Sequence, residues 1–335
     1  MPAHLVPISR RQFLAGSAST IAALGYSGLP GGDSQVNPDY WALLSDTHLL
    51  SAESIQRHYG NNQAAMENRA SLVAENFERV ARQVLALPEQ PAGLILNGDC
   101  VHVGGREEYD LLARKLQLLE TIPIHLAMGN HDHRENFSEV FQEQAQADDR
   151  ILLEDRHVSL LKSHSANLVV LDSLTMQDPD RPVKGPGILG NEQLEWLESV
   201  LDSEPGKPTV VFMHHNINPG NDVRERSGEE QLIMESADPV RSFEHGLQDT
   251  DRLLELLLAK PHVKAIVFGH MHQLRISRRR KLFVVSLPPV GYTFGPKEAV
   301  GWVKMLLRED GATLQVQTLD TDHAHHQKTV DLDWS

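Results

Sequence analysis

The chain has 335 residues, of which 40% are hydrophobic and 23% are charged, and its formal net charge is −15. This composition excludes a disordered, fibrous or polytopic membrane protein and is typical of one or two globular domains. The acidic balance argues against generic binding to nucleic acid or to an anionic membrane, and a single cysteine, Cys100, excludes an intramolecular disulfide. An anionic substrate is still compatible with this charge, because bound divalent cations can dominate the field inside a pocket.

Residues 1–36 are predicted to be an export signal and a linker. Arg10 and Arg11 precede Phe13, Leu14 and a mildly apolar stretch of small residues, a pattern that resembles a twin-arginine signal. The apolar stretch is short for a membrane span. We therefore expect an exported, periplasmic or extracytoplasmic protein that uses the twin-arginine translocation machinery. The sequence shows no clear cleavage motif, so retention by an uncleaved N-terminal anchor stays open.

Short apolar runs then alternate with longer amphipathic segments. The length and β-branched content of the runs predict buried strands, and apolar residues at three- and four-residue spacings predict helices. The predicted strands are residues 41–44, 93–96, 124–128, 167–171, 209–213 and 263–268, and the predicted helices are residues 67–87, 106–120, 191–201 and 251–260. This alternation is typical of a layered α/β protein.

The last third of the chain changes to three shorter runs, residues 282–287, 300–309 and 312–319. These runs predict antiparallel strands that complete a second sheet. We place the main domain at residues 37–320. Residues 321–335 are expected to be a C-terminal tail, in which His323 to His326 are expected to be disordered.

Aspartate, histidine or asparagine residues follow five of the predicted strands within about three residues. Because the carboxyl ends of parallel strands share one edge of a sheet, where ligands bind, these side chains are expected to converge. They are Asp46, His48, Asp99, Asn130, His214, His270 and His272. Oxygen and imidazole donors without a thiolate suit Mn, Fe, Zn or Ni. Seven donors are enough for two ions that share a bridging carboxylate, so the sequence predicts a dinuclear hydrolase.

These blocks, in this order, resemble the calcineurin-like metallophosphoesterases. The matching motifs are SDTH, NGD, GNHD, the histidine after residues 209–213, and GHMH, and the resemblance covers about residues 41–320. It implies an α/β fold, a four-layer α-β-β-α sandwich of two mixed β-sheets packed face to face, with the metal site at the carboxyl ends of the strands. It also implies two divalent or trivalent transition-metal ions per chain.

The resemblance also implies how the donors divide between the two ions. The first ion would be held by Asp46, His48 and His272, the second by Asn130, His214 and His270, and both by the bridging Asp99. The pair His214 and His215 is ambiguous from the sequence. The family pattern favours His214 as the ligand and puts His215 in the pocket wall.

Two residues of the GNHD motif would act in catalysis by the same resemblance. His131 would protonate the leaving alkoxide or stabilise its charge, and Asp132 would hold the orientation of His131. The implied reaction is hydrolysis of a phosphodiester bond through a metal-bridging hydroxide.

The type of ester is inferred from the same motifs. Purple acid phosphatases carry a tyrosine three residues after the bridging aspartate, and this chain has His102 there, so a coloured iron–tyrosinate centre is not expected. The motifs are instead similar to the bacterial cyclic-nucleotide and glycerophosphodiester phosphodiesterase branch. A phosphomonoesterase with the same dimetal site is the main alternative. A catalytically silent scaffold is a further alternative, although it would be expected to lose His131 or several donors.

The small phosphate-ester substrate is expected to contact the loops that follow the strands, because connections shape the pocket in this architecture. The candidates, chosen by position and charge, are His133, Arg134, His215, Arg224 and Arg226. The oligomeric state stays open.

Overall fold

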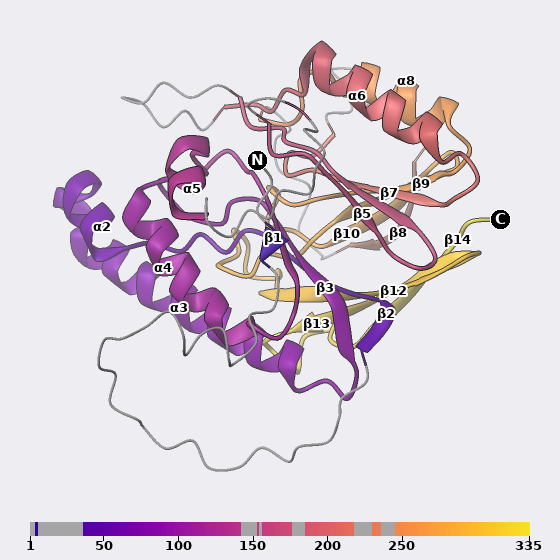
Figure 1. Ribbon diagram of the computed structural model, residues 1–335. Coiled ribbons are helices and arrows are strands. Elements are labelled where there is room, and N and C mark those ends of the chain that lie inside the picture. Colours follow the sequence, from indigo (N-terminus) through magenta and orange to yellow (C-terminus); the bar gives the residue numbers. More distant parts are fainter. Residues whose placement is uncertain are drawn as a thin grey trace, which may run out of the picture.

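The computed structural model describes residues 4–5, 36–141, 153, 156–175, 185–217, 230–235 and 245–335. Two seven-stranded sheets pack face to face, and helices cover the outer face of each (Figure 1). The expected mixed α/β sandwich is confirmed, and each of the six strands predicted before residue 270 is present.

The first sheet joins parallel strands from the N-terminal part to antiparallel strands from the C-terminal part. Its strands, in spatial order, are β1 (His4–Leu5), β4 (Ile124–Ala127), β3 (Gln90–Asn97), β2 (Val36–Leu44), β12 (Gly301–Arg308), β13 (Gly311–Thr318) and β14 (Thr329–Asp333). Strands β2, β3 and β4 are parallel, and β12 pairs with β2 in antiparallel register. The carboxyl ends of β2, β3 and β4 therefore lie on one edge.

The second sheet is also mixed. Its strands, in spatial order, are β5 (Ser159–Lys162), β6 (Asn167–Val170), β7 (Thr209–Phe212), β9 (Val263–Phe268), β11 (Leu282–Ser286), β10 (Arg275–Arg279) and β8 (Glu230–Glu235). Strands β6, β7, β9 and β11 are parallel, whereas β5, β10 and β8 run antiparallel to their neighbours. The ends of β7 and β9 supply the second half of the site described below.

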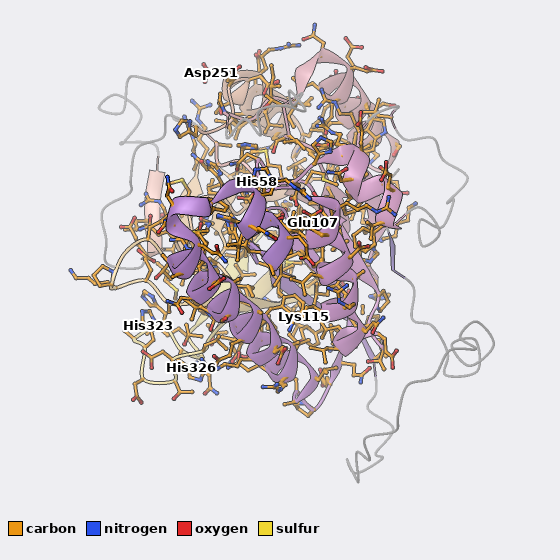
Figure 2. The ribbon with its side chains drawn as sticks, turned by 90° about the vertical axis from the view of Figure 1, so that its left-hand side faces the viewer. His58, Glu107, Lys115, Asp251, His323 and His326 are labelled. Carbon is orange, nitrogen blue, oxygen red and sulfur yellow. The ribbon has the colours of Figure 1, made fainter. Side chains whose placement is uncertain are left out.

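Two groups of helices form the outer layers. The first sheet is covered by α2 (Ala52–His58), α3 (Gln63–Leu85), α4 (Arg106–Leu116) and α5 (Arg134–Phe141), and the second by α6 (Gly190–Ser203) and α8 (Thr250–Ala259). Short 3₁₀ turns occupy Gly60–Asn62 and Gln117–Leu119. Figure 2 views the first helical layer from outside; there Lys115 of α4 pairs with Glu78 of α3.

Three apolar cores hold the four layers together, and β2 shows how one strand serves two of them. Trp41 and Leu43 point into the core between the sheets, whereas Ala42 and Leu44 point into the core under α3 and α4. This is the period of two that alternating side chains give a strand. Because both faces are buried, the strand is a continuous apolar run rather than an alternating one.

The C-terminal strands differ from the sequence expectation. Strands β12 and β13 extend the first sheet beside β2, not the second, and β11 is parallel to β9. The expectation was correct for the sheet to which β11 belongs and for the antiparallel direction of β12 and β13. An apolar run indicates that a strand is buried, but the run does not specify the neighbouring strand, which depends on the sheet edge that is open. Here β3 pairs with one edge of β2, and β12 pairs with the other.

The C-terminal residues also differ from the expected disordered tail. His323 and His326, labelled in Figure 2, lie in a turn where His323 Nε2 is 3.1 Å from the Lys297 carbonyl oxygen. Strand β14 then pairs with β13, and its Val330 and Leu332 are buried between exposed neighbours. The expectation of disorder is wrong because this short amphipathic edge strand was overlooked; the domain boundary at residue 320 stays a prediction.

Within the part of the chain that the structure describes, no helix combines the length and apolar character needed to cross a membrane. The predicted export motif, with Arg10 and Arg11, lies outside the described residues.

The core between the two sheets can be tested through the stability of the protein. Leu43 is fully buried between the sheets, so Leu43→Ala should lower the free energy of unfolding by about 2–5 kcal/mol, the usual cost of such a cavity. The control is Leu118→Ala, where the side chain is 47% exposed and the change should stay within about 0.5 kcal/mol. Denaturant midpoints measure both. Equal effects of the two substitutions would contradict the assigned core.

Candidate metal centre

The structure brings the seven predicted donors to one place, where the edges of the two sheets meet. Each donor lies just after a strand: Asp46 and His48 after β2, Asp99 after β3, Asn130 after β4, His214 after β7, and His270 and His272 after β9. All seven are buried or half-buried. Their convergence follows from the shared direction of the parallel strands in each sheet.

The donors form two groups that could each hold a metal ion. Asp46, His48, Asp99 and His272 make up one group, and Asp99, His214 and His270 make up the other. Asp99 belongs to both groups: its Oδ2 lies 3.5 Å from His48 Nε2 and 3.3 Å from His214 Nε2. Asn130 joins the second group, since its Oδ1 lies 2.9 Å from His270 Nδ1.

Backbone carbonyl groups fix the tautomers of two imidazoles. Nδ1 of His214 donates to the Asn97 carbonyl at 2.9 Å, and Nδ1 of His272 donates to the Tyr292 carbonyl at 2.6 Å. In the neutral ring, Nε2 then carries the lone pair. Nε2 of His214 is buried without a hydrogen-bond partner, and Nε2 of His272 lies 3.3 Å from Asp46 Oδ1. A lone pair that faces a carboxylate needs a cation between them, so these residues fit metal ions.

The pKa shifts of three buried donors are consistent with metal binding. Burial lowers the pKa of His48 well below its usual value, and burial with the nearby His214 lowers that of His270 to about 3. Burial opposes ionisation of Asp99, but His214 and His131 hold its pKa well below the usual range. Neutral imidazoles and an ionised carboxylate are the forms that bind metal.

The His214 imidazole faces the carboxylates of Asp99 and Asp46. Burial lowers the pKa of His214, but the carboxylates of Asp99 and Asp46 outweigh burial and raise it to about 9. A proton on Nε2 then supplies the positive charge opposite Asp99. Protons and metal ions therefore compete for the same position.

The backbone is strained at five of the seven donors. Asp46, His48, Asp99, His270 and His272 have φ between 45° and 66°, and only two other non-glycine residues in the described ranges have positive φ. This left-handed region is unfavourable for residues with a Cβ, and such strain persists where the surrounding structure enforces it, often at functional sites. The strain turns these side chains towards one another.

Two glycines permit the close packing around Asp99. Gly98 has a φ of 83°, and a Cβ there would lie 2.5 Å from His214 Nδ1. A Cβ on Gly129 would lie 2.2 Å from Asp99 Oδ1. Larger residues at either position would displace a donor.

The two predicted catalytic residues differ in their surroundings. His131 is half-buried beside the donors; its backbone N–H donates to Asp99 Oδ1 at 2.9 Å, and its Nδ1 donates to the His102 carbonyl at 2.6 Å. Asp132 is fully buried and accepts from the backbone N–H of Gly129 at 2.9 Å and from other groups of the loop. These hydrogen bonds let Asp132 shape the loop, while the His102 carbonyl orients the His131 ring.

The candidates for substrate contact lie in different settings. His133 is half-buried in the same loop, and the guanidinium of Arg134 forms a two-point ion pair with the buried Asp172 at 2.8 and 2.9 Å. His215 is buried, and its Nδ1 lies 2.7 Å from Ser173 Oγ, which leaves His214 as the one of this pair in the second donor group. Arg224 and Arg226 lie outside the described residues.

Three side chains near the donors were missed as functional by the sequence analysis. The His102 ring stacks on His131 with centroids 5.2 Å apart, Tyr292 lies 4.7 Å from the His272 ring, and Phe294 lies 4.3 Å from it. His102 was used only as evidence against an iron–tyrosinate centre. Tyr292 and Phe294 lie in the connection between the predicted strands at residues 282–287 and 300–309, for which no function was predicted. The aromatic residues in that connection were the available signal.

Comparisons with known proteins agree with this geometry. Residues 42–274 match the family model described as calcineurin-like phosphoesterase. A glycerophosphodiester phosphodiesterase of Enterobacter lignolyticus is 29% identical over 250 residues, covering 74% of this chain and 76% of its own length. A 3',5'-cyclic adenosine monophosphate phosphodiesterase of Vibrio vulnificus is 26% identical over 285 residues, covering 82% and 88%. The solved structure of a dimetal phosphatase from Danio rerio is 14% identical with a TM-score of 0.61, covering 88% of this chain and 99% of its own, and supports the fold.

Two carboxylate–imidazole groups with a shared carboxylate are the arrangement that two-metal phosphatases and nucleases use. The fold and the site therefore define a metal-dependent phosphoric ester hydrolase. The match over more than half of the chain shows that the protein belongs to the calcineurin-like phosphoesterase family.

The shared carboxylate can be tested through metal content. Asp99→Asn removes a charge from both donor groups, so the bound metal should fall from two ions per chain to one or none after dialysis against Mn²⁺ or Zn²⁺. The control is Asp172→Asn, which alters another fully buried carboxylate outside the groups and should retain both ions. Elemental analysis by mass spectrometry measures the ratio. Unchanged metal in Asp99→Asn would refute a shared ligand.

Proposed function

We propose that this protein hydrolyses phosphodiester bonds of small organic phosphates at a dinuclear metal centre. The observation that carries the proposal is the position of Asp99, which belongs to both donor groups and also accepts the backbone N–H of His131. The same carboxylate thereby links the metal ligands to the candidate proton donor.

The chain's own residues divide into two sets of ligands. Asp46, His48 and His272 would hold one ion, Asn130, His214 and His270 the other, and Asp99 both. When bound, such ions lower the pKa of a water molecule and neutralise the charge of the phosphoryl oxygens. Mn, Fe, Zn and Ni all suit these donors.

His131 would donate a proton to the leaving alcohol. Its Nδ1–H is held by the His102 carbonyl, so Nε2 is the nitrogen that gains and gives a proton. When water attacks phosphorus and the ester P–O bond breaks, the electron pair stays on the alkoxide oxygen. A proton from Nε2 of the imidazolium converts that alkoxide to the neutral alcohol.

One observation favours a diester over a monoester: the curated relatives described above are phosphodiesterases, at 26–29% identity. A monoesterase with the same centre is the second candidate, and the two differ in their relative rates on p-nitrophenyl phosphate and its bis-ester.

His131 generates a kinetic test of the proposal. His131→Ala should lower kcat for bis-p-nitrophenyl phosphate by about 10²- to 10⁴-fold, the usual contribution of a general acid, with two metal ions still bound. The control is His58→Ala on α2, where an exposed imidazole lies on the helical layer (Figure 2) and kcat should not change. Wild-type turnover in His131→Ala would show that the proton comes from another group.

We also propose that the protein is exported through the twin-arginine machinery, on the strength of Arg10, Arg11 and the small apolar residues after them. Replacing both arginines by lysine keeps the charge and removes the motif, so the protein should accumulate in the cytoplasm of an expressing bacterium. Cell fractionation with immunoblotting measures this. Equal export of the double variant would contradict the proposal.

A further inference from the structure

Phe294 is an aromatic side chain exposed beside the candidate metal centre. Half of its surface is accessible (50%), and its ring stacks on the His272 imidazole at 4.3 Å with an angle of 25° between the planes. The other strongly exposed large hydrophobic side chains of the described ranges are all aliphatic. An exposed phenyl ring in van der Waals range of a metal-ligand ring is therefore unusual in this molecule.

The segment before Phe294 is fixed to the donor loops by backbone hydrogen bonds. The N–H groups of Val290 and Gly291 donate to the carbonyl groups of Ser45 and Asp46 at 2.9 and 2.8 Å. The next residue, Tyr292, accepts from His272 Nδ1 through its carbonyl at 2.6 Å. Phe294 follows two residues later, so its position is set by the same bonds that orient two of the donors.

Helix α3 adds a cation to this aromatic surface. Asn76 Nδ2 donates to the Gly291 carbonyl at 2.9 Å, and Arg69, two helical turns earlier on the same face, places its guanidinium 4.7 Å from the centre of the Tyr292 ring. Arg69 is exposed. The stacking surface formed by Phe294, Tyr292 and Arg69 thus joins flat apolar rings to one positive charge.

We infer that this stacking surface binds the nucleobase of the substrate, so that the site selects nucleotides over esters of glycerol or other aliphatic alcohols. The inference rests on the proposed function. With the phosphate at the donor groups, the ring next to them is in reach of the organic part of the ester. A nucleobase presents a π-face that stacks on phenyl and guanidinium groups, whereas glycerol has no π-face to stack on a phenyl ring.

The test compares two phosphates that differ in their organic part. Adenosine 5'-monophosphate and glycerol 3-phosphate are titrated by calorimetry into the metal-loaded full chain, in the wild type, in Phe294→Leu and in Phe294→Tyr. Leucine keeps an apolar side chain without the flat face, and tyrosine keeps the face. Phe294→Leu should weaken the nucleotide about 5- to 150-fold, the range for one base–aromatic stack, and change glycerol 3-phosphate less than twofold. Phe294→Tyr should bind both as the wild type does.

Three results would overturn the inference. The first is equal affinity of the wild type for the two phosphates, and the second is unchanged nucleotide affinity in Phe294→Leu. The third is an equal loss of affinity for both phosphates in Phe294→Leu, which would mean that Phe294 only supports His272. Hydrolysis of bis-p-nitrophenyl phosphate by the same preparations separates this inference from the proposed function. Turnover without nucleotide preference would refute the stacking surface alone, and nucleotide preference without turnover would refute the catalytic proposal alone.

Discussion

The buried carboxylate of Asp99 is the group on which the arrangement of the site depends. It is 2% exposed, it lies within 3.5 Å of imidazole nitrogens from both sheets, and it accepts the N–H of His131. A buried charge costs several kcal/mol unless opposite charge and hydrogen bonds surround it. The loop after β3 supplies the carboxylate, and the loop after β7 supplies His214 opposite it. Face-to-face packing of the sheets is therefore a condition for ionising Asp99.

The same centre concentrates backbone strain that the rest of the fold must offset. Each residue held in the left-handed region costs on the order of 1–3 kcal/mol, and five of the donors adopt it. Direct bonds hold them there: Asp46 N–H donates to the Gly98 carbonyl at 3.1 Å, and His270 N–H donates to Asp46 Oδ1 at 3.1 Å. The three apolar cores supply the opposing stability. Hydrogen bonds within the protein thus hold Asp46 and His270 in place, which favours metal binding because little further ordering is needed.

The features that could be predicted from the sequence are those that depend on neighbouring residues, such as the buried strands and the polar residues that follow them. The run at residues 41–44, for example, which precedes Asp46, is buried on both faces and predicts a strand whatever its partners are. The parallel direction of such strands then brings the seven donors to the place where the edges of the two sheets meet. Contacts between residues far apart in the sequence could not be predicted from such local patterns. Three features are of this kind: the pairing of β12 with β2, the ion pair of Arg134 with Asp172, and the carbonyl groups that orient His131 and His272. They depend on which parts of the chain meet in space, and residue types alone do not indicate this. Tertiary context decides these features.

Tyr292 belongs both to the surroundings of the donor groups and to the proposed stacking surface. Its carbonyl fixes the tautomer of His272, and the centre of its ring lies 4.7 Å from that imidazole and 4.7 Å from the Arg69 guanidinium. Phe294 then covers the His272 ring from the same segment. A shift of this backbone, which is bonded to the loop of Asp46, would alter the orientation of the His272 donor and the proposed stacking surface together. A side-chain substitution at Phe294 would change the stacking surface alone. The connection that follows β11 is therefore as much a part of the centre as the strand ends that supply its ligands.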